Sequence, residues 1–292
     1  MTRSAAEQAL VFRCREEELI GILHPGAENA SRAVVLIVGG PQYRVGSHRQ
    51  FLLLARHLAA NGIPVLRFDY RGMGDSGGGF RDFEDIGDDI RAAVDALTRR
   101  LPDVPEVILW GLCDAATAAA FYAPTDKRVS GLVLLNPWVR SEAGIAKAYI
   151  RHYYARRLLS ADFWRKVIGG RFRAGKSLRS LAGMARRAAG SSGAAGAAVT
   201  DQPAAAPSLA SRMAAGIDRT DCPFLLILSG NDLTAKEFLD TTRDDRRWKK
   251  IFASRRLSRR DLAEADHTFS RAAWRDRVAD WTLEWIIAAE KD

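Results

Sequence analysis

VILWGLCDAA, residues 107–116, is the stretch that decides the fold. An apolar run leads into Gly111, Cys113 follows two positions later, and the small Ala115 stands two positions after that. A glycine, a nucleophile-type residue and a small residue at this spacing are typical of a sharp turn between a buried strand and a helix. The stretch therefore predicts that Cys113 stands in a strained turn above a sheet.

Short runs rich in Val, Ile and Leu alternate with helical patterns along the neighbouring sequence. The runs are 33–38, 64–68, 106–110, 131–136 and 224–229, and the helical patterns cover 47–62, 83–100, 116–124 and 268–290. Near-continuous apolar strands are typical of a parallel sheet with helices on both faces. We therefore expect a doubly wound α/β domain, with an antiparallel hairpin formed by 9–14 and 19–24 at its edge.

The alternation stops after Asn136 and resumes at Pro223. Residues 139–187 have helical patterns and are basic and aromatic, whereas 190–211 are rich in Ala, Gly, Ser and Pro. A segment of that second composition lacks the large apolar residues that offset the entropy of ordering. We therefore expect a core of residues 1–138 and 216–292, interrupted by a helical cap insertion at 139–215 whose residues 190–211 form a flexible loop.

Composition and charge narrow the class of protein. Hydrophobic residues make up 47% and charged residues 27%, which is ordinary for a globular chain. The net charge of +9 is concentrated in residues 140–187, which hold thirteen Lys and Arg against two acids. No apolar run of membrane-spanning or signal-peptide length is present, which favours a cytoplasmic location. The three cysteines and five histidines lack the spacing of a disulfide framework or a metal site, so we expect no metal.

Two further side chains follow the cysteine in the order that such a turn requires. Asp232, in SGNDLTA (229–235), comes directly after an apolar strand, and His267, in EADHTFS (264–270), precedes the terminal helix. In this order Cys113 is the nucleophile, His267 the base and Asp232 the acid that orients the imidazole. The alternatives are a cysteine packed as a small apolar residue and an aspartate in a surface turn.

Backbone donors for a developing oxyanion are expected from two places. One is the N–H of Asp114, the residue after the nucleophile. The other is the N–H of Gly40 in VGGPQYR (38–44), because Pro41 has no N–H; Gln42 is a further candidate, and the glycine pair also suits a tight turn. The glycines of FDYRGMGDSGGG (68–79) match no dinucleotide or phosphate-loop fingerprint, so no nucleotide cofactor is expected.

Six sequence blocks together resemble one family, the exosortase A system-associated hydrolases, first type. The blocks are VGGPQYRVGSHRQF, RFDYRGMGDS, LWGLCDAA, LNPWVR, SGNDLTAKEF and ADHTFSRAAWRD. The resemblance runs from about residue 9 to 287 and weakens over 190–211. It implies an α/β-hydrolase fold with a cysteine at the nucleophile position and a link to bacterial exopolysaccharide and protein-sorting (exosortase) systems. It implies no defined substrate.

The expected reaction is hydrolysis of an acyl ester or thioester through Cys113, His267 and Asp232. Two alternatives remain: an acyltransferase that uses the same triad, and a non-catalytic hydrolase-fold accessory protein. The basic segment at 139–187 is a candidate surface for an anionic carrier of the acyl group or an anionic membrane, unless its cations are merely solvated. No nucleic-acid-binding motif is present, so a nucleic-acid partner is not expected.

Overall fold

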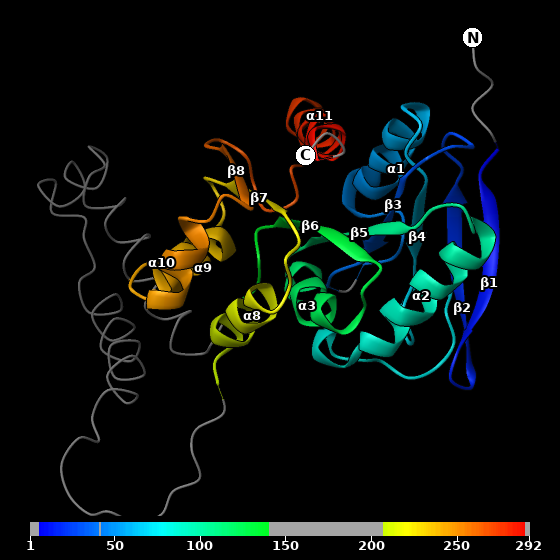
Figure 1. Ribbon diagram of the computed structural model, residues 1–292, viewed down its shortest axis with the longest axis horizontal. Coiled ribbons are helices and arrows are strands. Elements are labelled where there is room, and N and C mark those ends of the chain that lie inside the picture. Colours follow the sequence, from blue (N-terminus) through cyan, green and yellow to red (C-terminus); the bar gives the residue numbers. More distant parts are fainter. Residues whose placement is uncertain (1–5, 41, 140–206, 290–292) are drawn as a thin grey trace, which may run out of the picture.

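A computed structural model describes residues 6–40, 42–139 and 207–289 (Figure 1). Within these residues the strands form one eight-stranded sheet of order β1-β2-β4-β3-β5-β6-β7-β8. The strands are β1 (Gln8–Cys14), β2 (Glu17–His24), β3 (Arg32–Ile37), β4 (Val65–Phe68), β5 (Glu106–Leu112), β6 (Val129–Leu135), β7 (Phe224–Ser229) and β8 (Leu257–Leu262). β1 and β2 form an antiparallel hairpin, β2 is antiparallel to β4, and the remaining neighbours pair in parallel. The predicted α/β-hydrolase fold is confirmed.

The central strands are buried on both faces, which explains their continuous apolar sequences. Successive side chains of a strand point to opposite faces of the sheet. Leu109 of β5 therefore joins one buried cluster, together with Val35 of β3, whereas Ile108 and Trp110 join the other. Two separate cores result, one on each face.

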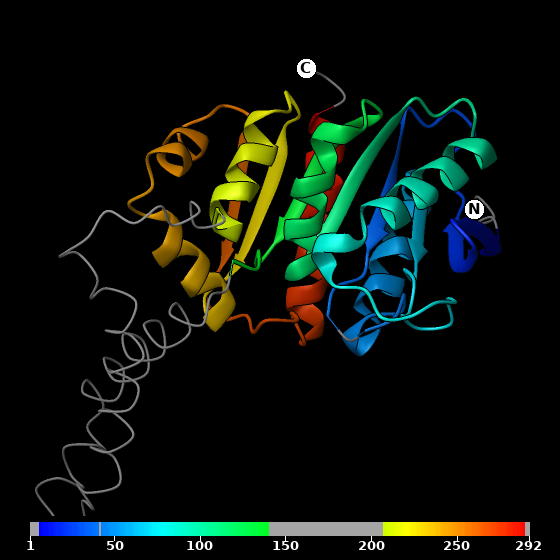
Figure 2. The ribbon, with the colours of Figure 1, turned by 90° about the horizontal axis from the view of Figure 1, so that it is seen from below.

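Helices cover both faces of this sheet. They are α1 (Gln50–Ala60), α2 (Gly87–Arg100), α3 (Asp114–Tyr122), α8 (Leu209–Asp218), α9 (Leu233–Thr242), α10 (Arg246–Phe252) and α11 (Ala272–Ala288), with 3₁₀ turns η1 (Ser47–Arg49), η2 (Phe83–Asp85) and η3 (Ala123–Thr125). α1 and α11 lie on one face and α2, α3 and α8 on the other (Figure 1). The second group lies side by side across the sheet (Figure 2).

α8 packs closely against α3 and is therefore part of the core of the molecule. A Cβ at Gly216 of α8 would lie 2.2 Å from the carbonyl oxygen of Ala120 in α3, so the two backbones almost touch. α8 begins at Leu209, with Ser208 as its N-cap. The helix therefore includes the last residues of the stretch expected to be a loop at 190–211. Residues 140–206 of the expected cap lie outside the described residues.

β8, α9 and α10 were not predicted from the sequence. β8 reads LSRRDL, and its residues 259–261 are exposed because the strand lies at the edge of the sheet. An edge strand with this exposure contains no apolar run from which it could be predicted. α3 also begins earlier than the helical pattern at 116–124, since its first residue, Asp114, follows the cysteine directly.

Candidate active site

Cys113 occupies the turn between β5 and α3. Its backbone has φ 66° and ψ −125°, a conformation that costs a non-glycine residue about 1–3 kcal/mol. A Cβ at Gly111 would lie 2.5 Å from the carbonyl carbon of Ala115, so only glycine lets the strand end pass so close to the helix start. Ala115 itself is fully buried. The local sequence thus holds the cysteine at a tight, strained corner.

The half-buried thiol of Cys113 lines a cavity of about 470 Å³. His267 lines the same cavity, and Phe51, Phe83 and Trp138 supply aromatic walls. The N–H of Trp138 donates to the carbonyl oxygen of Cys113 at 3.2 Å, which ties the wall to the turn. An apolar cavity with a few convergent polar groups is the usual form of a small-molecule site.

His267, which lines this cavity, pairs with Asp232 from a loop 35 residues away. The Nδ1 atom of His267 lies 2.9 Å from Oδ2 of Asp232. The Asp232 carboxylate also accepts the N–H groups of Thr234 and Ala235, each at 3.1 Å, and so caps the N-terminus of α9. The carboxylate that orients the imidazole is therefore itself fixed by a helix.

The environment of His267 favours its charged form. Burial opposes the charge, but hydrogen bonds to Asp232 and Cys113 and the charges of these two groups outweigh it and raise the pKa of His267 to about 10. A histidine with a raised pKa next to a thiol is a strong acceptor of the thiol proton. The structure thus brings the three residues singled out in the sequence, Cys113, Asp232 and His267, to one place.

Asn136, at the end of β6, holds the loops of this site together. It is fully buried and has φ 43°. Its Nδ2 donates to Ser229 Oγ at 2.9 Å and to the carbonyl oxygen of His267 at 3.1 Å, and its Oδ1 accepts the N–H of Ser229 at 2.8 Å. The Ser229 hydroxyl in turn donates to the carbonyl oxygen of Asp266. Sequence reasoning missed this residue, although a polar side chain ending an apolar strand was a visible signal.

Gly40 and Asp114, the two residues expected to supply backbone oxyanion donors, are in contact with each other. The N–H of Gly40 donates to both carboxylate oxygens of Asp114, at 2.9 and 3.0 Å. The N–H of Ala115 donates to the same carboxylate at 2.9 Å. Burial raises the pKa of Asp114, and the hydrogen bonds from Gly40 and Ala115, with a smaller contribution from its own N–H, only partly oppose this. The Gly40 N–H, expected to face an oxyanion, is thus engaged by a side chain of its own protein.

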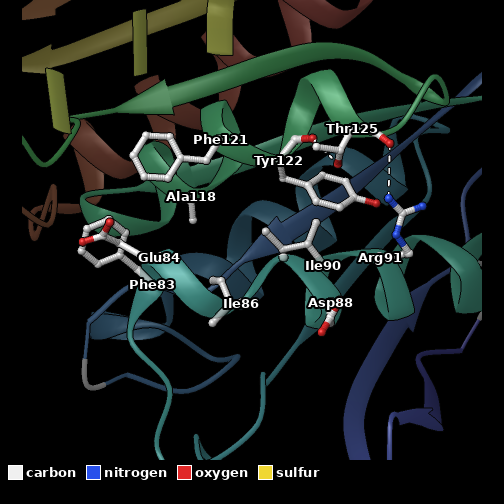
Figure 3. A pocket seen from close by; sticks show the side chains of 11 residues that line it. Phe83, Glu84, Ile86, Asp88, Ile90, Arg91, Ala118, Phe121, Tyr122 and Thr125 are labelled. Atoms are coloured by element: carbon white, nitrogen blue, oxygen red, sulfur yellow. Dashed lines mark hydrogen bonds between the residues drawn. The ribbon is translucent and has the colours of Figure 1, made fainter. Parts of the chain in front are cut away.

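A second cavity, of about 280 Å³, lies between η2, α2 and α3 (Figure 3). Phe83 lines both cavities. Ile86, Ile90 and Phe121 add apolar walls to the second cavity, and polar groups gather at its other end, where Arg91 donates to the carbonyl oxygen of Thr125 at 3.2 Å. None of the residues singled out in the sequence lines this second cavity.

The described residues form neither a metal site nor a membrane-spanning helix. No cluster of three or more His, Cys, Asp or Glu side chains there has the arrangement of a metal site. Among the helices of the described segments, none has the length and apolar character needed to cross a bilayer.

The chain is similar to known hydrolases. A family model described as "Serine aminopeptidase, S33" matches residues 29–237. No curated protein matches the chain in sequence.

Three solved structures illustrate the likeness in fold. An esterase of Pyrococcus furiosus superposes with a TM-score of 0.63 at 15% identity, covering 97% of this chain and 91% of that one. Est1E of Butyrivibrio proteoclasticus with bound ferulic acid gives 0.59 at 14% identity, covering 97% and 100%. An alpha-beta hydrolase of Vibrio vulnificus gives 0.60 at 17% identity, covering 99% and 82%. At these identities the likeness shows the fold alone.

Proposed function

Because the chain belongs to the serine aminopeptidase S33 family of α/β hydrolases, we propose that it hydrolyses ester or thioester bonds with Cys113 as its nucleophile. The observation that carries this proposal is the position of the thiol, on a strained turn in the same cavity as a histidine bound to a buried aspartate. The family's description names serine, whereas this chain has Cys113 at the turn proposed to hold the nucleophile. A thiolate is the reactive form of cysteine, and an adjacent base provides it.

In the first half of the reaction, Cys113 Sγ attacks the acyl carbonyl carbon while His267 takes the thiol proton. The pair of electrons of the carbonyl double bond moves to oxygen, then returns as the bond to the leaving alcohol or thiol breaks. His267 gives its proton to that leaving group, and Asp232 holds the imidazole in one tautomer throughout. The acyl group is now on the sulfur.

In the second half, His267 removes a proton from water, and the hydroxide attacks the acyl-thioester. The acyl–sulfur bond breaks, the carboxylic acid leaves, and the thiol regains its proton. Ester substrates are supported by two structural relatives, the Pyrococcus furiosus esterase and Est1E with bound ferulic acid. The aromatic walls of the cavity, Phe51, Phe83 and Trp138, suit an apolar acyl group.

An acyl-enzyme on Cys113 is the direct test. Purified protein mixed with 4-nitrophenyl butanoate or a short acyl-thioester should gain the mass of one acyl group on the peptide that contains residue 113. Cys113→Ala should stay folded, form no adduct and lose activity, whereas Cys113→Ser should keep partial activity because His267 and the oxyanion donors remain. Turnover without an adduct, and undiminished in Cys113→Ala, would refute the proposed nucleophile.

The biological setting is a further part of the proposal and rests on sequence alone. The six blocks that resemble exosortase-associated hydrolases support a link to exopolysaccharide and protein-sorting systems, and the cytoplasmic location also stays a prediction. The basic segment 139–187, a candidate surface for an anionic acyl carrier or an anionic membrane, lies outside the described residues from position 140 on.

The carrier idea has its own test. Replacing Arg156, Arg157, Arg165 and Lys166 by Glu should raise KM for a coenzyme A thioester and leave KM for 4-nitrophenyl butanoate unchanged. The KM of the unaltered protein for the thioester should also rise with salt, because exposed charges are screened within about 10 Å at 0.1 M ionic strength. An equal effect on both substrates would argue against a carrier site.

A further inference from the structure

Three backbone N–H groups that follow β3 donate hydrogen bonds to other groups of the protein. The N–H of Gly40 donates to the Asp114 carboxylate, and the N–H of Gln42 donates to the carbonyl oxygen of Gly40 at 2.8 Å. The N–H of Ser47 then donates to Oε1 of Gln42 at 2.9 Å. The backbone donors at Gly40 and Gln42 are therefore already in use.

The Asp114 carboxylate is firmly held in front of the Gly40 N–H. It also accepts the N–H of Ala115, and a Cβ on Gly39 would lie 2.4 Å from its Oδ1, so little free space surrounds it. To free Gly40, the carboxylate would have to give up both donors. If it stayed charged and in place, it would also repel an oxyanion arriving at the same N–H.

The side chain of Gln42 offers a donor at the same cavity. Its Oε1 accepts the Ser47 N–H, which identifies the other amide atom, Nε2, as the one left to donate. Gln42 lines the cavity with Cys113 and His267. Across the described segments, no protein group is hydrogen-bonded to Nε2, and the atom is not among the buried atoms that lack a partner. The amide is thus oriented and free to bind a ligand oxygen.

We propose that the side-chain amide of Gln42 is the second oxyanion donor, together with the N–H of Asp114. This inference rests on the proposed function, since it concerns the oxygen that becomes negative when Cys113 Sγ bonds to the acyl carbon. Nε2 donates to that oxygen while the carbonyl electron pair resides on it, and the hydrogen bond weakens when the leaving group departs. The Asp114 carboxylate then acts as a positioning group that holds the loop at Gly40.

Two substitutions separate the donor from the shape of the side chain. Gln42→Glu keeps an oxygen for the Ser47 N–H but places a carboxylate where the amide donor was. Gln42→Met keeps the length and removes both polar atoms. Each should slow acylation of Cys113 by 4-nitrophenyl butanoate about 10²–10³-fold, the usual loss of one oxyanion donor, and should lower kcat with little change in KM.

Alkylation by iodoacetamide is the matched chemical control, because displacement of iodide develops no oxyanion. Its rate at Cys113 should be unchanged in Gln42→Met, which shows that thiol and base are intact. Gln50→Met is the matched control variant, since Gln50 begins α1 near the same loop but does not line the cavity. It should acylate at the unaltered rate.

The outcomes divide cleanly. Slow acylation with normal alkylation supports the Gln42 donor. Normal acylation in both Gln42 variants overturns it and leaves the Gly40 N–H, released from Asp114, as the second donor. If the unaltered protein forms no acyl adduct on Cys113, the proposed function itself fails and the inference falls with it.

Discussion

His267 couples the chemistry of the site to the stability of the fold. Its pKa in the folded chain is about 10, against an ordinary value of 6.5, so between these values the folded chain holds a proton that the unfolded chain has lost. The stabilisation from this group is therefore fully present below pH 6.5 and is lost as the pH rises toward 10. The residue proposed as the base of the reaction thus also contributes to stability in a pH-dependent way.

Urea unfolding at a series of pH values tests this coupling. The difference in free energy of unfolding between the unaltered protein and His267→Gln should shrink from pH 6.5 to 10 and stay constant below pH 6. In an Asp232→Asn background the decline should be weaker, because a hydrogen bond and a charge that raise the His267 pKa are gone. A difference independent of pH up to 10 would contradict the raised pKa.

Arg71 and Asp89 form a buried ion pair that ties the loop after β4 to α2. Arg71 donates from Nε and Nη2 to the two carboxylate oxygens at 2.9 and 2.8 Å, and both side chains are at most 5% exposed. Asp89→Asn should reduce the free energy of unfolding by about 3–5 kcal/mol, because a buried guanidinium loses its counter-charge.

The neighbouring residue provides the control for this prediction. Asp88 pairs mainly with Arg15 on the surface, where the two side chains are 46% and 70% exposed, and its Oδ2 lies only at the limit of an ion pair with Arg71, at 3.9 Å. Asp88→Asn should change the free energy of unfolding by no more than about 1 kcal/mol. Similar losses in the two variants, measured by urea titration, would show that burial does not decide the strength of these pairs.

Among the elements of the fold, the turn between β5 and α3 requires glycine at position 111, because glycine has no Cβ. Gly111→Ala places a Cβ 2.5 Å from the backbone of α3, so the strand and helix must separate. We expect a loss of stability above about 3 kcal/mol, near the upper end for single substitutions, with loss of activity. Gly87→Ala, at the start of α2, meets nothing within 4 Å and should stabilise by about 0.4–1 kcal/mol. Thermal melts of the two variants would compare them directly; equal melting temperatures would rule out a steric role for Gly111.

The strands predicted for the centre of the sheet share one property, burial on both faces. β3, β5, β6 and β7 have almost no polar residues, so their sequences alone predict strands. β8 is stabilised by hydrogen bonds to β7 and only partly by burial. Backbone hydrogen bonds produce no apolar pattern in the sequence from which such a strand could be predicted. Cys113 and Asp232 were predicted to follow strands, and loops at the carboxyl ends of parallel strands meet at one edge of the sheet. His267 follows β8, which was not predicted.

The finer parts of the site could not be predicted, because they depend on contacts between distant loops. The Asp114 side chain reaches a glycine 74 residues away, and Asn136 bonds to a carbonyl 131 residues away. Nothing in the local sequence of either residue specifies which loop lies opposite. The engagement of Gly40 by Asp114 therefore emerged only from the folded arrangement.

Across the whole molecule, the three thiols differ sharply in access. Cys14 is 3% exposed and burial raises its pKa to about 11. Burial also raises the pKa of Cys222, whose thiol donates to the carbonyl oxygen of Val129. Cys113 alone of the three lines the cavity that contains His267.

Iodoacetamide at limiting dose near pH 7 should therefore alkylate Cys113 first, with activity falling in proportion to the label. Peptide mapping by mass spectrometry measures both the site and the extent. In Cys113→Ser, labelling should be far slower and should appear at Cys222 before Cys14. Early labelling of Cys14, with activity tracking it, would point to a different essential thiol.

The order of the strands divides the chain into two complementary pieces. Residues up to 139 contain β1 to β6 and Cys113, whereas residues from 207 contain β7, β8, Asp232 and His267. The two pieces meet through the β6–β7 ladder and the packing of α3 on α8. Expressed as separate polypeptides, each half would carry an incomplete site, and hydrolysis would begin only when they recombine. The chain is thus suited to division into a split enzyme. If each half were fused to another protein, hydrolysis would report the association of those two proteins.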